Sequence, residues 1–194
     1  VGCTTPSFGI GSTTLEVTNN GEDFEAAALP FLFHEEEQIL ELEPPHGVAT
    51  GNTRVLAWGS GFLPGGKVSC RFGENVMPGA VLNNSVVVCY SPGSAALGTV
   101  NVSVSNNGQN FPKSSITFRY HHRPTVTRLE PHWAGTSGGS IITVHGTGFF
   151  SDPRAVCRYS DGQTGFGALV TPATVMSGEL LTRAAPAHEQ GSVT

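Results

Sequence analysis

Apolar and polar residues alternate along several short segments of this chain. Residues 100–104 alternate valine with polar side chains, which is the period-2 pattern of a strand with one buried face. Asn-Asn-Gly follows at 106–108, and Asn and Gly readily adopt the positive φ of a hairpin turn. Apolar residues alternate again over 116–120. The pattern predicts two antiparallel strands joined by that turn.

Two further segments read as strands. Residues 141–144 (Ile-Ile-Thr-Val) begin a buried strand, and residues 86–90 are apolar on both faces, as in a short central strand. No segment shows a convincing helical period. Strands of this length about every ten residues are typical of a β-sandwich. We therefore expect an all-β chain.

A long internal repeat organises these strands, because many residues recur 87 positions later. The matched pairs include Leu42 with Leu129, Gly59 with Gly146, Phe62 with Phe149, Cys70 with Cys157, and Asn19–Gly21 with Asn106–Gly108. Matches in one fixed register indicate tandem structural units. We expect residues 1–37 to be the C-terminal part of one unit, 38–121 a complete unit, and 122–194 the N-terminal part of a third. The units follow one another almost without a linker, which fits a stiff string of domains.

Composition narrows the classes of partner. The 194 residues include 25 glycines and 13 prolines, only 13% are charged, and the formal net charge is −5. Without a basic footprint, we expect no nucleic-acid partner. No apolar run approaches the roughly 20 residues of a membrane helix, so we expect no membrane insertion within this segment. The missing initiator Met and signal segment indicate a mature or excised piece, whose anchor could lie outside it.

The cysteines and glycosylation triplets indicate the compartment. None of the four cysteines forms a CxxC pair, which excludes a zinc ribbon or a thioredoxin-type motif. Asn83 and Asn101 each begin an Asn-x-Ser triplet, so both are candidate N-glycosylation sites. Together with the repeats, these features favour an extracellular or cell-surface glycoprotein.

The motifs as a set resemble the IPT/TIG domain over nearly the whole chain. They are Gly138-Gly139, Gly146-x-Gly148-Phe149, Cys70-x-Phe72-Gly73, Cys89-x-x-Pro92 and Val102-x-Val104-Ser105-x-Asn107-Gly108-x-x-Phe111. The resemblance implies tandem immunoglobulin-like β-sandwiches, one complete and two partial. Such domains occur in plexins, Met-type receptors and fibrocystin-like proteins, in some transcription factors and bacterial or algal surface proteins, and beside some carbohydrate enzymes. The fold by itself does not fix a function.

The resemblance also implies a disulfide between Cys70 and Cys89, against the simpler reading of two buried free thiols. Cys3 begins Cys-x-x-Pro, so it is the second cysteine of its unit and its partner is expected upstream. Arg183 stands where the partner of Cys157 is expected. Two readings stay open: Cys3 and Cys157 form an intermolecular disulfide, or Cys157 is free and the partner of Cys3 lies outside this sequence.

The two partial units are complementary, since one carries the strands that the other lacks. Copies could join head to tail by β-strand addition, and a contact that does not close on itself generates a filament. The competing reading is a window cut from a longer array. The two pieces overlap, because residues 1–3 and 181–183 both match the strand that holds Cys89, and this overlap weakens strict complementation.

Motifs for catalysis or metal binding are weak. Residues 135–139 match GxSxG, but they lie in a turn between strands rather than between a strand and a helix, so we treat the match as chance. The pair at 121–122 cannot form a histidine cluster alone, and the acidic run at 35–37 lacks the Asp-x-Asp pattern of a calcium loop. We expect no enzyme, no cofactor and no metal site.

Two functions remain. The first is a non-enzymatic extracellular structural protein, the repeat subunit of a fibre that assembles head to tail and carries glycans. The alternative is a fragment of a receptor-like ectodomain, of the plexin, Met or fibrocystin kind, that binds a protein ligand and contains a specific apolar patch.

Overall fold

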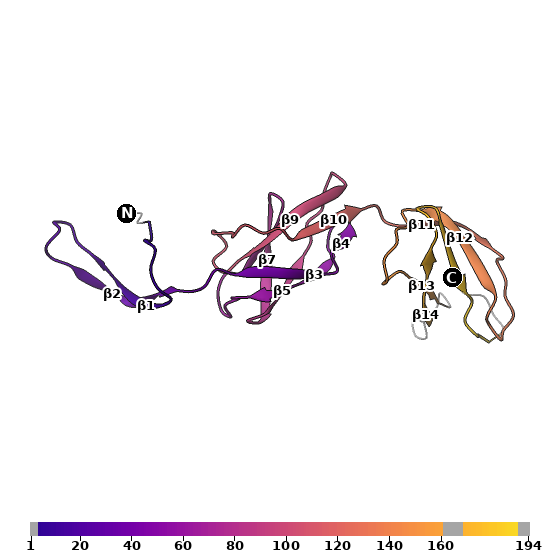
Figure 1. Cartoon of the computed structure of the whole chain (residues 1–194), viewed down its shortest axis with the longest axis horizontal. Coiled ribbons are helices and arrows are strands. Elements are labelled where there is room, and N and C mark those ends of the chain that lie inside the picture. The colour runs from indigo at the N-terminus through magenta and orange to yellow at the C-terminus, as the bar shows by residue number, and fades with distance from the viewer. Residues whose placement is uncertain (1–3, 161–168, 190–194) are drawn as a thin grey trace. The chain divides into compact units, whose positions relative to one another are not determined.

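The computed structural model describes residues 4–160 and 169–189, and every regular element in these ranges is a β-strand (Figure 1). The all-β class expected from the sequence is confirmed. The chain separates into two compact units. The first, residues 1–120, contains an N-terminal hairpin and the complete sandwich, and the second is residues 121–194.

The first unit begins with a two-stranded antiparallel hairpin, β1 (Gly11–Val17) and β2 (Glu25–Phe33), drawn in indigo in Figure 1. Gly11 lies opposite Phe33 in this hairpin. The equivalent strands of the next repeat, β9 (Gly98–Ser105) and β10 (Thr117–His121), place Gly98 opposite Tyr120. The repeat seen in the sequence is thus a repeat of strand register as well.

Eight strands build the complete sandwich. Besides β9 and β10 they are β3 (Gln38–Glu43), β4 (His46–Val48), β5 (Arg54–Ser60), β6 (Ser69–Phe72), β7 (Asn75–Asn83) and β8 (Val86–Tyr90). Their hydrogen-bonded order is β3-β5-β8-β7-β6-β9-β10-β4.

Strand β7 turns this string of strands into two layers. Its residues 75–78 pair with β6, whereas residues 79–83 pair with β8. We call β3, β5, β8 and residues 79–83 the first layer, and residues 75–78 with β6, β9, β10 and β4 the second layer. Gly79 stands where the strand passes between them, and its N–H donates to the carbonyl of Val68 at 2.9 Å.

The core lies between the two layers, because alternate residues of each strand point inward. The first layer contributes Val55, Ala57 and Val87, which are fully buried. From the second layer come aromatic rings in edge-to-face contact, with ring centroids 5.3 Å apart for Phe72 and Phe118. Edge-to-face packing of this kind adds to the burial of apolar area.

The second unit repeats the first layer and, from the second layer, the pair formed by β6 and the start of β7. Its strands are β11 (Thr125–Glu130), β12 (Ile141–Thr147), β13 (Val156–Tyr159), β14 (Leu169–Pro172), β15 (Thr174–Val175) and β16 (Leu180–Ala184). They form a β11-β12-β16-β15 sheet and a β13-β14 pair. The core centres on Ile142, Val144 and Leu181.

Candidate functional site

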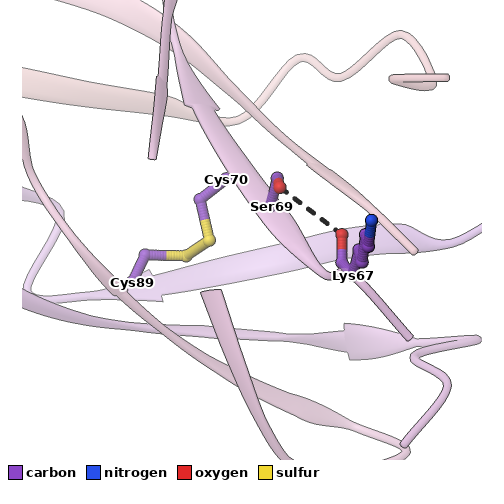
Figure 2. Close-up of a disulfide and its surroundings, with 4 residues drawn as sticks. All are labelled: Lys67, Ser69, Cys70 and Cys89. Carbon is purple, nitrogen blue, oxygen red and sulfur yellow. Dashed lines mark hydrogen bonds between the residues drawn. A yellow bond between two sulfur atoms is a disulfide. The ribbon is translucent and has the colours of Figure 1, made fainter. Parts of the chain in front are cut away.

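A disulfide joins the two layers of the complete sandwich. Cys70 on β6 and Cys89 on β8 are both fully buried, and their Cα atoms lie 6.1 Å apart. Figure 2 shows the bridge crossing from one strand to the other, beside Ser69, whose hydroxyl donates to the Lys67 carbonyl. The cross-link therefore ties the two layers together beside the place where β7 passes from one to the other.

The equivalent position in the second unit holds a different pair of groups. Cys157 on β13 is a free, partly buried thiol that packs against the core. Arg183 on β16 lies opposite Ile142, just as Cys89 lies opposite Val55, and its guanidinium donates to the Pro172 carbonyl. Burial raises the pKa of the Cys157 thiol, and the nearby Arg183 charge opposes that rise. A disulfide from Cys157 to another copy would require this inward-facing thiol to become exposed. Cys3 lies outside the described residues.

Both candidate glycosylation sites lie at the surface. Asn83 ends β7, and its side-chain oxygen accepts a hydrogen bond from the Ser85 backbone at 2.9 Å. Asn101 is exposed on β9, in the second layer. The two side chains thus lie on different layers of the sandwich.

The first layer carries apolar side chains on its outer surface as well as on its inner one. In β5 and β8 the outward pairs are Leu56 with Val88 and Trp58 with Val86, and Ala80 of β7 lies beside Val88. Tyr90 continues the row at the end of β8. We call Leu56, Trp58, Ala80, Val86, Val88 and Tyr90 the outer apolar face. Trp58 is 42% exposed and Tyr90 46%, whereas Val86 and Val88 are nearly covered by their neighbours.

The same surface in the second unit is mixed, because Leu180 and Ala184 hold the positions of Val86 and Tyr90. The positions of Leu56 and Trp58 are held by Thr143 and His145, and Thr182 lies opposite Thr143 where Val88 lies opposite Leu56. An exposed cluster borders it: the Glu130 carboxylate lies 3.1 Å from the Arg128 guanidinium and 3.4 Å from the His145 ring. The fold therefore accepts polar residues at these positions.

The sequence did not predict that the outer apolar face would lie at the surface. The structure places the Trp58 side chain on the outside of the first layer. The available signal was the run at 86–90, which is apolar on both faces. A strand buried on one side only would have alternated with polar residues.

Two hollows lie beside strand β3 of the complete sandwich. A hollow of about 170 Å³ lies between the start of β3 and residues 112–115, below the 300–1,000 Å³ usual for small-molecule sites. A more open depression of about 350 Å³ beside Leu40 and Ile116 has only one charged residue, Glu41, in its lining.

The structure gives no support to the candidate catalytic and metal-binding motifs. Residues 135–139 lie in the bend between β11 and β12, without a helix after them. Within residues 4–160 and 169–189, no group of three or more acidic, histidine or cysteine side chains is placed to hold a metal ion. The same ranges contain no helix able to cross a membrane.

Comparison with known proteins identifies the repeats. The sequence profile of the IPT/TIG domain matches residues 38–120 and 124–194, which confirms the resemblance seen in the motifs. Plexin-A2 of Mus musculus is 32% identical over 153 residues, covering 76% of this chain and 8% of that protein. Plexin-A3 of Homo sapiens is 30% identical over 128 residues, covering 64% of this chain and 7% of that protein. The chain thus spans less than a tenth of the length of these relatives.

The fold agrees with a solved structure, the full extracellular region of plexin A4, domains 1 to 10. The match has a TM-score of 0.57 at 22% identity and covers 96% of this chain and 16% of that one. It shows a shared fold. Together with the sequence relatives it implies an extracellular or cell-surface location, as expected from the sequence.

Proposed function

This chain belongs to the IPT/TIG domain family and is homologous to the IPT domains of plexin extracellular regions, and from that premise we propose that it is part of a receptor-like ectodomain that binds a protein ligand. The homology to Plexin-A2 over 153 residues carries the proposal. It favours the receptor alternative over the fibre subunit, for which the relatives provide no support. The role is non-catalytic, since the units are binding or structural domains.

Within this proposal, residues 1–37 complete one unit, 38–121 form a whole unit, and 122–194 begin a third. The disulfide between Cys70 and Cys89 stabilises the middle unit in the oxidising space outside the cell. Asn83 and Asn101 carry N-linked glycans. Loss of mass on endoglycosidase treatment of the secreted chain, abolished by Asn83→Gln with Asn101→Gln, tests the last point.

Electron microscopy of the native material separates the two functions. Antibodies against this chain should label discrete particles on cell surfaces, and the extracted protein should be monodisperse in negative stain. Filaments decorated at regular intervals would overturn the receptor proposal and favour head-to-tail assembly by strand addition. Non-reducing electrophoresis of the same material tests the Cys3–Cys157 disulfide, which would add a covalent ladder of copies that reduction removes.

A further inference from the structure

Asn101 lies in the middle of the outer surface of the second layer. Its strand, β9, pairs with β6 on one side and with β10 on the other, and Asn101 is directly opposite Thr117 of β10. On the β6 side the neighbouring position is Gly73, whose N–H donates to the Asn101 carbonyl at 2.8 Å. A Cβ at Gly73 would meet only Val100 within 4 Å. The exposed Asn101 side chain therefore has free space beside it on that side.

Two arginines flank Asn101 diagonally, one on each neighbouring strand. Arg71 of β6 lies opposite Ser103, two residues after Asn101. Arg119 of β10 lies opposite Thr99, two residues before it. Diagonal neighbours in a sheet are about 7–8 Å apart, which is within reach of a long side chain. Both guanidinium groups can therefore approach a group that is attached to the Asn101 side chain.

An aromatic ring holds the first of these guanidinium groups in place. The central carbon of the Arg71 guanidinium lies 4.7 Å from the centre of the Phe111 ring, which is a cation–π contact. The contact uses the flat face of the guanidinium, whereas its five N–H donors lie in the plane of the group. Arg71 therefore keeps hydrogen-bond donors for a further partner.

The surroundings of Asn101 offer the groups that bind a saccharide. No carboxylate stands among the outward residues of β6, β9 and the paired part of β10, which are Ser69, Arg71, Thr99, Asn101, Ser103, Thr117 and Arg119. Hydroxyl groups and guanidinium donors suit a sugar, because its hydroxyl and acetamide oxygens accept hydrogen bonds.

The β1–β2 hairpin has the same register without these groups. Thr14 occupies the place of Asn101, and Leu32 occupies the place of Arg119. Leu32 is an exposed apolar side chain. Where the glycosylation triplet is absent, the arginine beside it is absent as well.

We propose that the first N-acetylglucosamine of the glycan on Asn101 lies on the outer surface of the second layer, where Arg71 and Arg119 donate hydrogen bonds to its acetamide and hydroxyl oxygens. This inference rests on the glycosylation of Asn101 proposed above. The covalent link favours the contact, because an attached group has a high effective concentration. The contact stabilises the complete unit. A glycan in this place also covers the second layer and closes it to a protein ligand.

The other proposed glycosylation site, Asn83, lacks this environment. Asn83 ends β7, opposite Val86, and at this point β7 has a paired strand on one side only. No arginine or lysine occurs in β7 or in its partner β8. A glycan on Asn83 therefore makes no such contact, and the two sites serve as a matched pair.

Thermal unfolding of the secreted glycoprotein, followed by Trp58 fluorescence with Trp133→Phe, tests the contact. Asn101→Gln should lower the unfolding midpoint by about 3–6 °C, whereas Asn83→Gln, which removes an equivalent glycan, should shift it by less than about 1 °C. In chain produced without glycans, Asn101→Gln should leave the midpoint unchanged. Trimming each glycan to one N-acetylglucosamine with an endoglycosidase should retain the stabilisation, because the first sugar makes the contact.

Substitution of the arginines identifies the groups that hold the sugar. Arg71→Gln with Arg119→Gln should abolish the stability difference between chains with and without the Asn101 glycan. Arg158→Gln is the matched control and should leave that difference unchanged, because Arg158 holds the place of Arg71 in the second unit. Comparing glycosylated and unglycosylated forms of each variant removes any effect of the substitution on folding itself.

Mass spectrometry of the glycopeptides separates failure of the contact from failure of the glycosylation. An unmodified Asn101 in the secreted chain would overturn the glycosylation and the contact with it. An occupied Asn101 whose glycan stabilises no more than the glycan on Asn83 would overturn the contact alone. So would a stabilisation that persists with Arg71→Gln and Arg119→Gln, or one that is lost when the glycan is trimmed to its first sugar.

Discussion

The carboxylate of Glu37 accepts hydrogen bonds from both the backbone N–H and the side-chain amide of Asn106, at 2.7 and 3.2 Å. Both residues are buried, with 7% and 5% of their surface exposed. Asn106 also donates to the Gly61 carbonyl at 2.8 Å and accepts from the Leu63 N–H at 3.0 Å. The Asn106 side chain thereby links three segments: the residue before β3, the β5–β6 connection and the turn after β9.

Replacing Asn106→Ala should destabilise the complete unit by roughly 2–4 kcal/mol. The substitution leaves a buried carboxylate with one hydrogen bond fewer and also removes the partners of a partly buried carbonyl and N–H. Urea unfolding followed by Trp58 fluorescence, with Trp133→Phe to silence the other unit, measures the change. Gln109→Ala, at an exposed position in the same connection, should stay within about 0.5 kcal/mol. Equal effects of the two substitutions would show that the Asn106 contacts contribute little.

Removing the disulfide should cost the complete unit about 3 kcal/mol of unfolding free energy. The bridge closes a loop between residues separated by 19 positions, so its loss frees the unfolded chain. Cys70→Ala with Cys89→Ala, compared with the parent in urea, gives the value. Dithiothreitol should lower the stability of the parent by a similar amount and leave the double variant unchanged. A reductant effect on the double variant would point to another disulfide.

Adding one methyl group at Gly79 should destabilise the sandwich by about 1–3 kcal/mol, the usual cost of overpacking a core. A Cβ there would lie 2.9 Å from the Cys70 sulfur and 3.2 Å from methyl groups of Val68 and Val87. The control is Gly93→Ala, because its Cβ would meet nothing closer than 3.5 Å. Thermal unfolding of the two variants should differ clearly, and indistinguishable midpoints would mean that the layers can separate to make room at β7.

Alkylation of Cys157 should be slower in the folded protein than in the unfolded one at pH 8. Burial raises the pKa of this thiol above its ordinary value of 9.0, so less thiolate is present at a given pH. Because the folded-state pKa is the higher one, stability from this group is complete below pH 9.0 and falls as the pH rises past it. Iodoacetamide labelling with mass spectrometry follows the reaction.

Arg183→Gln provides the matched variant for that measurement. The Arg183 charge opposes the rise in the Cys157 pKa, so its removal should slow alkylation of the folded protein further. The rate in urea should be the same for both proteins. Faster labelling of the variant would indicate that Arg183 acts mainly by covering the thiol.

The pattern of apolar and polar residues predicted much of the fold, because it indicates where strands lie and which of their faces are buried. The valines of residues 100–104 and the apolar run at 86–90 became strands β9 and β8. The repeat of 87 residues predicted that β11 and β12 would be structurally equivalent to β3 and β5. The IPT/TIG motifs predicted the immunoglobulin-like fold as well, because their glycines lie in turns and their cysteines in the core of that fold.

The outer apolar face was beyond reach of that reasoning. Alternation tells which residues share a face, but it does not tell whether a second apolar face is covered by another layer or left to solvent. Trp58 could equally have packed in a core, and only the pairing of β5 with β8 and β3 shows it on the outside. The crossing of β7 was hidden for a similar reason, because its two halves form one continuous run of sequence.

The sequence by itself determined the class of fold, the repeat, the family and the extracellular setting, since these follow from short-range periodicity and from motifs in a fixed register. Tertiary structure alone decided which surfaces meet: Glu37 with Asn106 across 69 positions, and strand β7 with both β6 and β8. Such contacts depend on how strands pair and how layers stack, which local sequence constrains only weakly.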